Sequence, residues 1–90
     1  MKRQLKIEEA ANELGVDQTL LVRFIEEHWI LPVVKEQRAF DEEDLARSRL
    51  ICALRNEFGV NDDAVPIILN LLDQMHYLQD QVREILKQDR

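Results

Sequence analysis

A long apolar repeat occupies the C-terminal third of the chain and leaves it few ways to fold. From residue 64 to residue 85, apolar side chains recur at alternating steps of four and three, which is the heptad spacing of a coiled-coil helix. A solitary helix with this stripe would fray or be insoluble in water, so the stripe needs a partner, and self-association supplies one most simply. The sequence therefore predicts a homodimer whose interface consists of Ile68, Leu71, Met75, Leu78, Val82 and Ile85.

The N-terminal part of the chain predicts two short helices joined by a tight turn. Apolar residues from Ile7 to Leu14 recur at the three- and four-residue steps of one helix face, and Gly15 suits the left-handed residue that ends a helix. Asp17 is placed to cap a second helix over residues 18–28. Two short helices joined by a few residues that include glycine are typical of a helix-turn-helix motif.

Residues 29–40 differ in character from the helices around them. An apolar, β-branched run contains Pro32, which no helix interior tolerates, and a polar turn follows. This pattern predicts a short extended arm or a minimal two-stranded wing.

Two further helices are expected after this segment. Asp41 can cap the third, whose buried stripe should be Leu50, Leu54 and Phe58, flanked by Ile51, with three arginines largely off that stripe and Gly59 at its end. Pro66 favours Asp63 as the cap of the last helix, because proline is tolerated in a first turn. Only two glycines and two prolines occur in 90 residues, so the predicted fold class is all-α.

The charge balance argues against a nucleic-acid partner. Twelve basic and eighteen acidic side chains give a net charge of −6, and the excess lies mainly in residues 41–90, with six basic and eleven acidic groups. DNA-binding affinity comes largely from neutralising phosphates, whereas an acidic chain attracts basic proteins.

No constellation of residues predicts catalysis. Ser48 and Cys52 share the third helix without a nearby histidine, and Cys52 is better read as a small apolar filler. A single cysteine and two histidines cannot build a typical zinc site, and no glycine-rich phosphate loop is present. We therefore expect no enzyme activity, metal, cofactor or small-molecule substrate. Without a signal-like or membrane-length apolar stretch, the expected location is the cytoplasm.

Two surfaces are candidates for partner binding. One is an acidic stripe on the last helix with an aromatic ring at its centre. The same pattern fits about equally well the solvated outer face of a coiled-coil helix. The stripe consists of Asp73, Tyr77, Asp80 and Glu84. The other belongs to the alternative of direct DNA binding, through Arg23, Lys35 and Arg38, which stand among many carboxylates.

From end to end the chain resembles the MerR family of winged helix-turn-helix proteins. The similarity runs from Ile7-x-Glu9-x-Ala11-x-x-Leu14-Gly15-Val16 through Val22-Arg23-Phe24-Ile25-Glu26 and Ile30-Leu31-Pro32 to Arg38-x-Phe40-x-x-x-Asp44-Leu45-x-Arg47. It continues through Ile51-x-x-Leu54-Arg55, Gly59-Val60 and Leu71-Leu72. The wing departs from the family pattern, because Gln37-Arg38-Ala39 stands where Gly-Tyr-Arg is usual, and we expect no effector domain after the last helix. The resemblance implies a winged helix-turn-helix head over residues 1–60 and a dimerisation helix over residues 61–90.

One branch of that superfamily resembles the chain more closely. Leu69-x-Leu71-Leu72-Asp73-x-Met75-x-x-Leu78 leads into a terminal coiled-coil helix, as in the chaperone-modulator (CbpM-like) proteins, which are also short and acidic. This resemblance implies a partner, a DnaJ-like co-chaperone of the CbpA type. It also implies a role, in which binding to the J-domain blocks stimulation of the Hsp70 ATPase.

Overall fold

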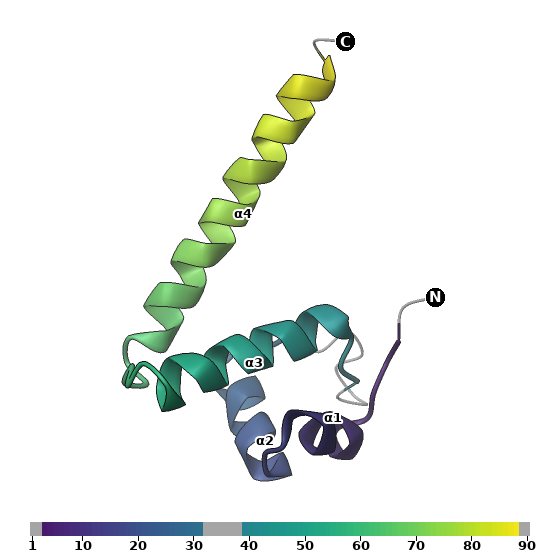
Figure 1. Ribbon diagram of the computed structural model, residues 1–90, viewed down its shortest axis with the longest axis vertical. Coiled ribbons are helices and arrows are strands. Elements are labelled where there is room, and N and C mark those ends of the chain that lie inside the picture. The colour runs from purple at the N-terminus through teal and green to yellow at the C-terminus, as the bar shows by residue number, and fades with distance from the viewer. Residues whose placement is uncertain (1–2, 32–38, 89–90) are drawn as a thin grey trace. The chain divides into compact units, whose positions relative to one another are not determined.

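The computed structural model describes residues 3–31 and 39–88, which contain four helices (Figure 1). In chain order these are α1 (Ile7–Leu14), α2 (Gln18–Glu26), α3 (Glu42–Asn56) and α4 (Val65–Gln88). Within those two ranges no strand forms, and extended pairing is limited to an isolated bridge. The predicted all-α fold with a long C-terminal helix is confirmed.

The chain divides after Gly59 into two compact units, residues 1–59 with α1, α2 and α3, and residues 60–90 with α4. The core of the first unit is apolar and draws on all three helices and on the segments between them. Its buried apolar residues are Ala10, Ala11, Leu21, Phe24, Trp29, Ile30, Ala39, Phe40, Leu45 and Ile51.

The turn between α1 and α2 forms as predicted at Gly15. This residue adopts φ +71°, which glycine reaches without the steric cost that a side chain adds, and its amide donates to the carbonyls of Ala11 and Asn12. Asp17 occupies the cap position of α2, but its side chain accepts no capping hydrogen bond. The helix ends at Glu26, two residues earlier than predicted, and His28 follows in the left-handed region at φ +62°.

Aromatic packing fixes the segment that leaves α2. The rings of Phe24 and Trp29 lie 5.6 Å apart between centroids, tilted by 41°, and both residues are buried. The guanidinium of Arg55 lies 5.9 Å from the centre of the Phe24 ring. An arginine expected on the surface of α3 thus covers the core.

The buried face of α3 differs from the predicted one. Leu50 is exposed to 37% and Phe58 to 72%, while Leu45 and Ile51 are fully buried. Ser48 is also fully buried, with its hydroxyl donating to the carbonyl of Asp44 at 2.7 Å, and Phe58 lies beyond the end of the helix. With its polar atom satisfied inside the helix, Ser48 occupies the inward face that hydropathy alone assigns to larger residues.

The N-terminal end of α3 matches the prediction, whereas its C-terminal end comes earlier than predicted. The predicted cap is confirmed at Asp41, whose Oδ1 accepts from the Asp44 amide at 2.8 Å, and Asp44 Oδ2 accepts from the Asp41 amide at 3.1 Å. This reciprocal pair is a capping box made from two carboxylates. The helix ends at Asn56, and Gly59, with φ +64°, lies three residues beyond that end.

Phe40, which lies just before α3, pairs with Leu5 near the start of the chain. Leu5 and Phe40 form an antiparallel bridge in which each amide donates to the other carbonyl, at 2.8 and 2.7 Å. The predicted wing falls mainly on residues 32–38, outside the described residues. The bridge between Leu5 and Phe40 thus joins the residue that follows this undescribed stretch by two positions to the start of the chain.

The second unit consists of a short turn and α4. The amide of Ala64 donates to the side chain of Asn61 at 3.0 Å, and helical structure begins at Val65, so the predicted cap at Asp63 is wrong. Pro66 lies in the first turn of α4 as expected, where its missing amide hydrogen costs nothing.

Candidate partner-binding surfaces

The acidic stripe of α4, defined as Asp73, Tyr77, Asp80 and Glu84, is exposed along its whole length. Tyr77 exposes 63% of its surface. Asp80 lies 3.5 Å from Arg83, and Glu84 lies 3.9 Å from Lys87, each pair on one turn of helix. The stripe thus presents carboxylates to solvent, with the two cations Arg83 and Lys87 close by.

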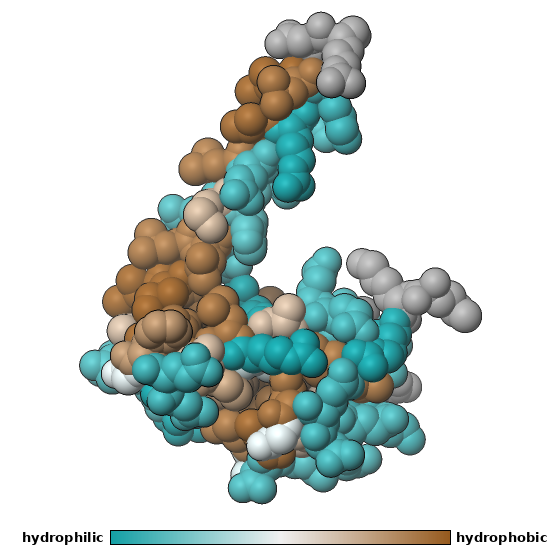
Figure 2. Space-filling view, viewed as in Figure 1, coloured by the Kyte–Doolittle hydropathy of each residue, from teal (hydrophilic) through white to brown (hydrophobic). Residues whose placement is uncertain are grey.

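The predicted dimer residues form a second surface of α4, here called the apolar seam and defined as Ile68, Leu71, Met75, Leu78, Val82 and Ile85. All but the half-buried Ile68 are exposed, with Leu71, Leu78 and Ile85 each open to 58–61%. Figure 2 shows apolar side chains gathered along one side of α4 over most of its length. Six apolar residues in register on one helix face form a continuous surface that water solvates poorly.

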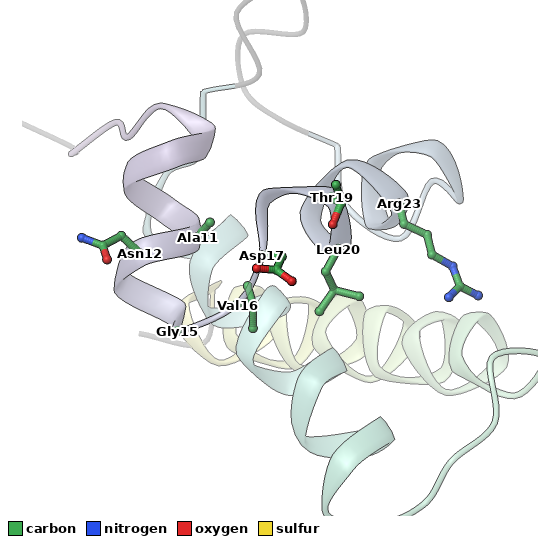
Figure 3. Close-up of a pocket in the computed structure, with 8 residues that line it drawn as sticks. All are labelled: Ala11, Asn12, Gly15, Val16, Asp17, Thr19, Leu20 and Arg23. Atoms are coloured by element: carbon green, nitrogen blue, oxygen red, sulfur yellow. The ribbon is translucent and has the colours of Figure 1, made fainter.

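The third surface lies on the first unit, at the turn of the helix-turn-helix motif. Two adjoining hollows there share Ala11, Asn12, Val16 and Asp17, and so form one surface, called here the turn groove. Glu8, Glu9 and Gln18 complete one end, and Gly15, Thr19, Leu20 and Arg23 complete the other (Figure 3). The sequence alone did not predict this grouping. Its pattern indicated solvated or helix-dipole charges for the carboxylates, whereas the groove combines residues of α1, α2 and the turn between them.

Most described cations of the first unit are engaged within the chain. Arg3 donates to Glu42 at 2.6 Å and to Glu13 at 2.9 Å, and these hydrogen bonds raise the pKa of its guanidinium. Arg49 lies 3.6 Å from the same Glu13 carboxylate, and the Nε of Arg47 donates to the Trp29 carbonyl at 2.6 Å.

The residues assigned to the DNA-binding alternative are only partly described. Arg23 is exposed on α2 and lines the turn groove, whereas Lys35 and Arg38 lie outside the described residues. Glu26 and Glu27, which follow Arg23 at the end of α2, are exposed as well. On α2, therefore, Arg23 is the single basic residue, and two exposed carboxylates follow it at the end of the helix.

The predicted filler at Cys52 is half-buried on α3, beside a hollow lined by Leu14, Arg49 and Asn56. Burial raises the pKa of its thiol, which opposes the thiolate that a nucleophile or a metal ligand requires. Among the described residues, no group of three or more histidine, cysteine or acidic side chains could hold a metal ion. No helix in the described part of the chain is long and apolar enough to cross a membrane.

Comparison with known proteins places the chain in a family. No curated protein gives a significant match to the sequence. A family model described as a MerR helix-turn-helix family regulatory protein matches residues 5–88, which span the first unit and nearly all of α4. Such regulatory proteins are typically not enzymes. The match covers most of the chain, and the helix-turn-helix and long terminal helix agree with it, so the chain belongs to the MerR helix-turn-helix family.

Proposed function

We propose that this chain is a non-enzymatic regulator that binds the J-domain of a DnaJ-like co-chaperone and blocks stimulation of Hsp70. The observation that carries the proposal is the exposed acidic stripe of α4, on a chain whose net charge is −6. A J-domain presents a basic helix to its Hsp70 partner, and an acidic surface competes for such a helix. The resemblance of the chain to chaperone-modulator proteins supports the same partner.

The cations beside the stripe do not prevent such binding. Arg83 and Asp80 keep about 70% of their side chains exposed, and Lys87 and Glu84 are similarly open. An ion pair this exposed contributes only about 0–1 kcal/mol, because water already solvates both charges. A basic partner can therefore displace Arg83 or Lys87 from its carboxylate at little cost, and Tyr77 offers it an aromatic contact.

The apolar seam gives the proposed regulator a way to form a homodimer. Two α4 helices that pair along it would cover six apolar side chains on each, and burial of a leucine contributes about 1.5–3 kcal/mol. The acidic stripe and the seam are distinct sets of residues on α4, so pairing through the seam leaves the stripe's own residues for a partner.

A binding comparison tests the proposal. A tagged J-domain protein is passed over the immobilised full-length chain at moderate salt, and the same chain is titrated into genomic DNA in a gel-shift assay. We expect retention of the J-domain without a DNA shift. Failure to retain the J-domain at any salt concentration contradicts the proposal.

DNA binding is the second candidate function. It is favoured by the family itself and by the exposed Arg23 on the second helix of the motif, which would act with Lys35 and Arg38 in a dimer. A shift that persists at moderate salt, with no J-domain retained, supports this candidate. A shift seen only at low salt does not, because weak phosphate contacts fade steeply as salt rises.

A further inference from the structure

The turn groove combines an apolar floor with an acidic rim. Ala11 is buried at its base, and Val16 and Leu20 are half-buried, so that their methyl groups are open to a partner. Glu8 and Glu9 line one end, Asp17 belongs to both hollows, and all three are exposed. Aliphatic groups beside carboxylates suit a ligand that is itself both apolar and basic.

The charged residues of the groove are distributed along its length. Figure 3 shows Asn12 on α1 and Arg23 on α2 extending in opposite directions, with Val16, Asp17 and Leu20 between them. Arg23, the cation among the lining residues, thus stands at the end of the groove away from Glu8. In the hollow that Glu8 and Glu9 line together with Asp17, the charged lining residues are all carboxylates.

Asp17 makes this surface unfavourable for a phosphate backbone. It occupies the cap position of α2, where the helix terminus would otherwise attract an anion, and its side chain makes no capping hydrogen bond. A carboxylate at that point repels phosphate and attracts an ammonium or guanidinium group. In DNA-binding helix-turn-helix proteins, the N-terminal end of the second helix faces the duplex. The carboxylates at that end here favour a positively charged partner instead.

We propose that the turn groove binds a basic amphipathic helix of a partner protein. The apolar face of that helix contacts Val16 and Leu20, and its lysines or arginines lie toward Glu8 and Asp17. This inference goes beyond the proposed function, because it assigns a second protein-binding surface, on the first unit and separate from the acidic stripe of α4.

A direct test uses the full-length chain, labelled with nitrogen-15, and a synthetic helical peptide. The peptide has about 18 residues, with lysines on one face and leucines on the other, which is long enough to form a helix when bound. We expect its addition to shift the amide resonances of Ala11, Val16 and Leu20. The affinity is then measured by fluorescence anisotropy with a labelled copy of the peptide.

Matched variants distinguish binding at the turn groove from a nonspecific effect of the chain's negative charge. The double variant Glu8→Gln/Asp17→Asn removes two charges from the rim, and Glu26→Gln/Glu27→Gln removes two exposed charges from the same unit outside the groove. We expect the first to weaken binding about fivefold and the second less than twofold. Circular dichroism of each variant verifies that the helices are retained.

Three outcomes overturn the inference. These are equal loss in both variants, resonance shifts confined to α4, and groove resonances that respond to a DNA duplex but not to the peptide. The variant Asp73→Asn/Asp80→Asn keeps the two proposals apart. It should leave the peptide-induced shifts at the groove unchanged, whereas loss of J-domain binding in this variant concerns only the acidic stripe.

Discussion

Arg47 on α3 donates from its Nε to the backbone carbonyl of Trp29 at 2.6 Å, and this hydrogen bond links two segments 18 residues apart. Trp29 is buried just beyond the end of α2, so its carbonyl has little access to water. The bond therefore holds the exit of the helix-turn-helix motif against α3.

Loss of this bond should destabilise the first unit. Arg47→Ala leaves the Trp29 carbonyl without this donor, and we expect the free energy of unfolding to fall by about 1–3 kcal/mol. Urea unfolding followed by the fluorescence of Trp29, the single tryptophan, measures the change. Arg49→Ala is the control, because its exposed pair with Glu13 at 3.6 Å should contribute less than about 1 kcal/mol. Equal effects in the two variants would show that the Trp29 contact is unimportant.

The capping box of α3 should make stability depend on pH. Burial raises the pKa of Asp44 to about 6, which its bond from the Asp41 amide only partly offsets. An aspartate in the unfolded chain has a pKa of about 3.9. Between roughly pH 4 and pH 6 the folded state therefore binds more protons than the unfolded state. The free energy of unfolding should therefore fall as pH rises through that window, by about 2–3 kcal/mol.

Asp44→Asn isolates this contribution, because its amide oxygen can still accept from the Asp41 amide. We expect the variant to lack the fall in stability that the parent chain shows from about pH 4 to pH 6. Glu43→Gln, an exposed neighbour, should retain most of that fall, because the charge of Glu43 is the smallest of the causes that raise the pKa of Asp44. Parallel pH dependence in the parent chain and Asp44→Asn would mean that Asp44 does not titrate in this window.

Charge reversal on α4 tests the acidic stripe. Asp73→Lys/Asp80→Lys should weaken J-domain binding roughly tenfold at low ionic strength, with a smaller loss at higher salt, because the screening length shrinks from about 30 Å at 0.01 M to about 8 Å at 0.15 M. Glu43→Lys/Glu57→Lys changes the net charge equally on exposed sites of the first unit and should have less effect. Isothermal titration calorimetry at several salt concentrations measures both. Unchanged affinity in the α4 variant would remove the stripe as the binding site.

A polar substitution in the apolar seam tests the homodimer. Leu78 exposes 61% of its surface in the single chain, and Leu78→Asp would place a carboxylate within the predicted coiled-coil interface. We expect sedimentation equilibrium to show a dimer for the parent chain and a monomer for the variant. Gln79→Asp, an exposed position outside the seam, should remain dimeric. A monomeric parent chain would contradict the seam's role in self-association.

Local rules predicted most of the helical structure because each acts within a few residues. Gly15 and Asp41 occupy the predicted terminal positions of their helices, where backbone geometry and capping hydrogen bonds decide the outcome. The long apolar repeat likewise predicted a single helix, observed as Val65–Gln88.

The inward face of α3 could not be predicted from hydropathy. Ser48 is buried because its hydroxyl is satisfied within the helix, and Phe58 is exposed beyond the helix end. Arg47 donates to the Trp29 carbonyl, and the guanidinium of Arg55 lies over the Phe24 ring. Such contacts depend on how the helices pack rather than on spacing along one of them.

The candidate surfaces differ in whether their residues lie on one helix or on two. The acidic stripe could be read from the sequence because all of its residues lie on one helix, and the structure adds Arg83 and Lys87 beside it. The turn groove joins residues of α1 and α2 across the turn at Gly15, so its acidic rim emerged only from the folded arrangement.

The ATPase rate of Hsp70 tests most directly whether this chain inhibits a DnaJ-like co-chaperone. The rate is measured with a DnaJ-like co-chaperone present while the full-length chain is added in increasing amounts. We predict that the stimulated ATPase rate falls to the basal rate near stoichiometric saturation of the J-domain. The ATPase rate of Hsp70 without the co-chaperone should be unaffected. A stimulated rate that stays constant in large excess of the chain would contradict this prediction.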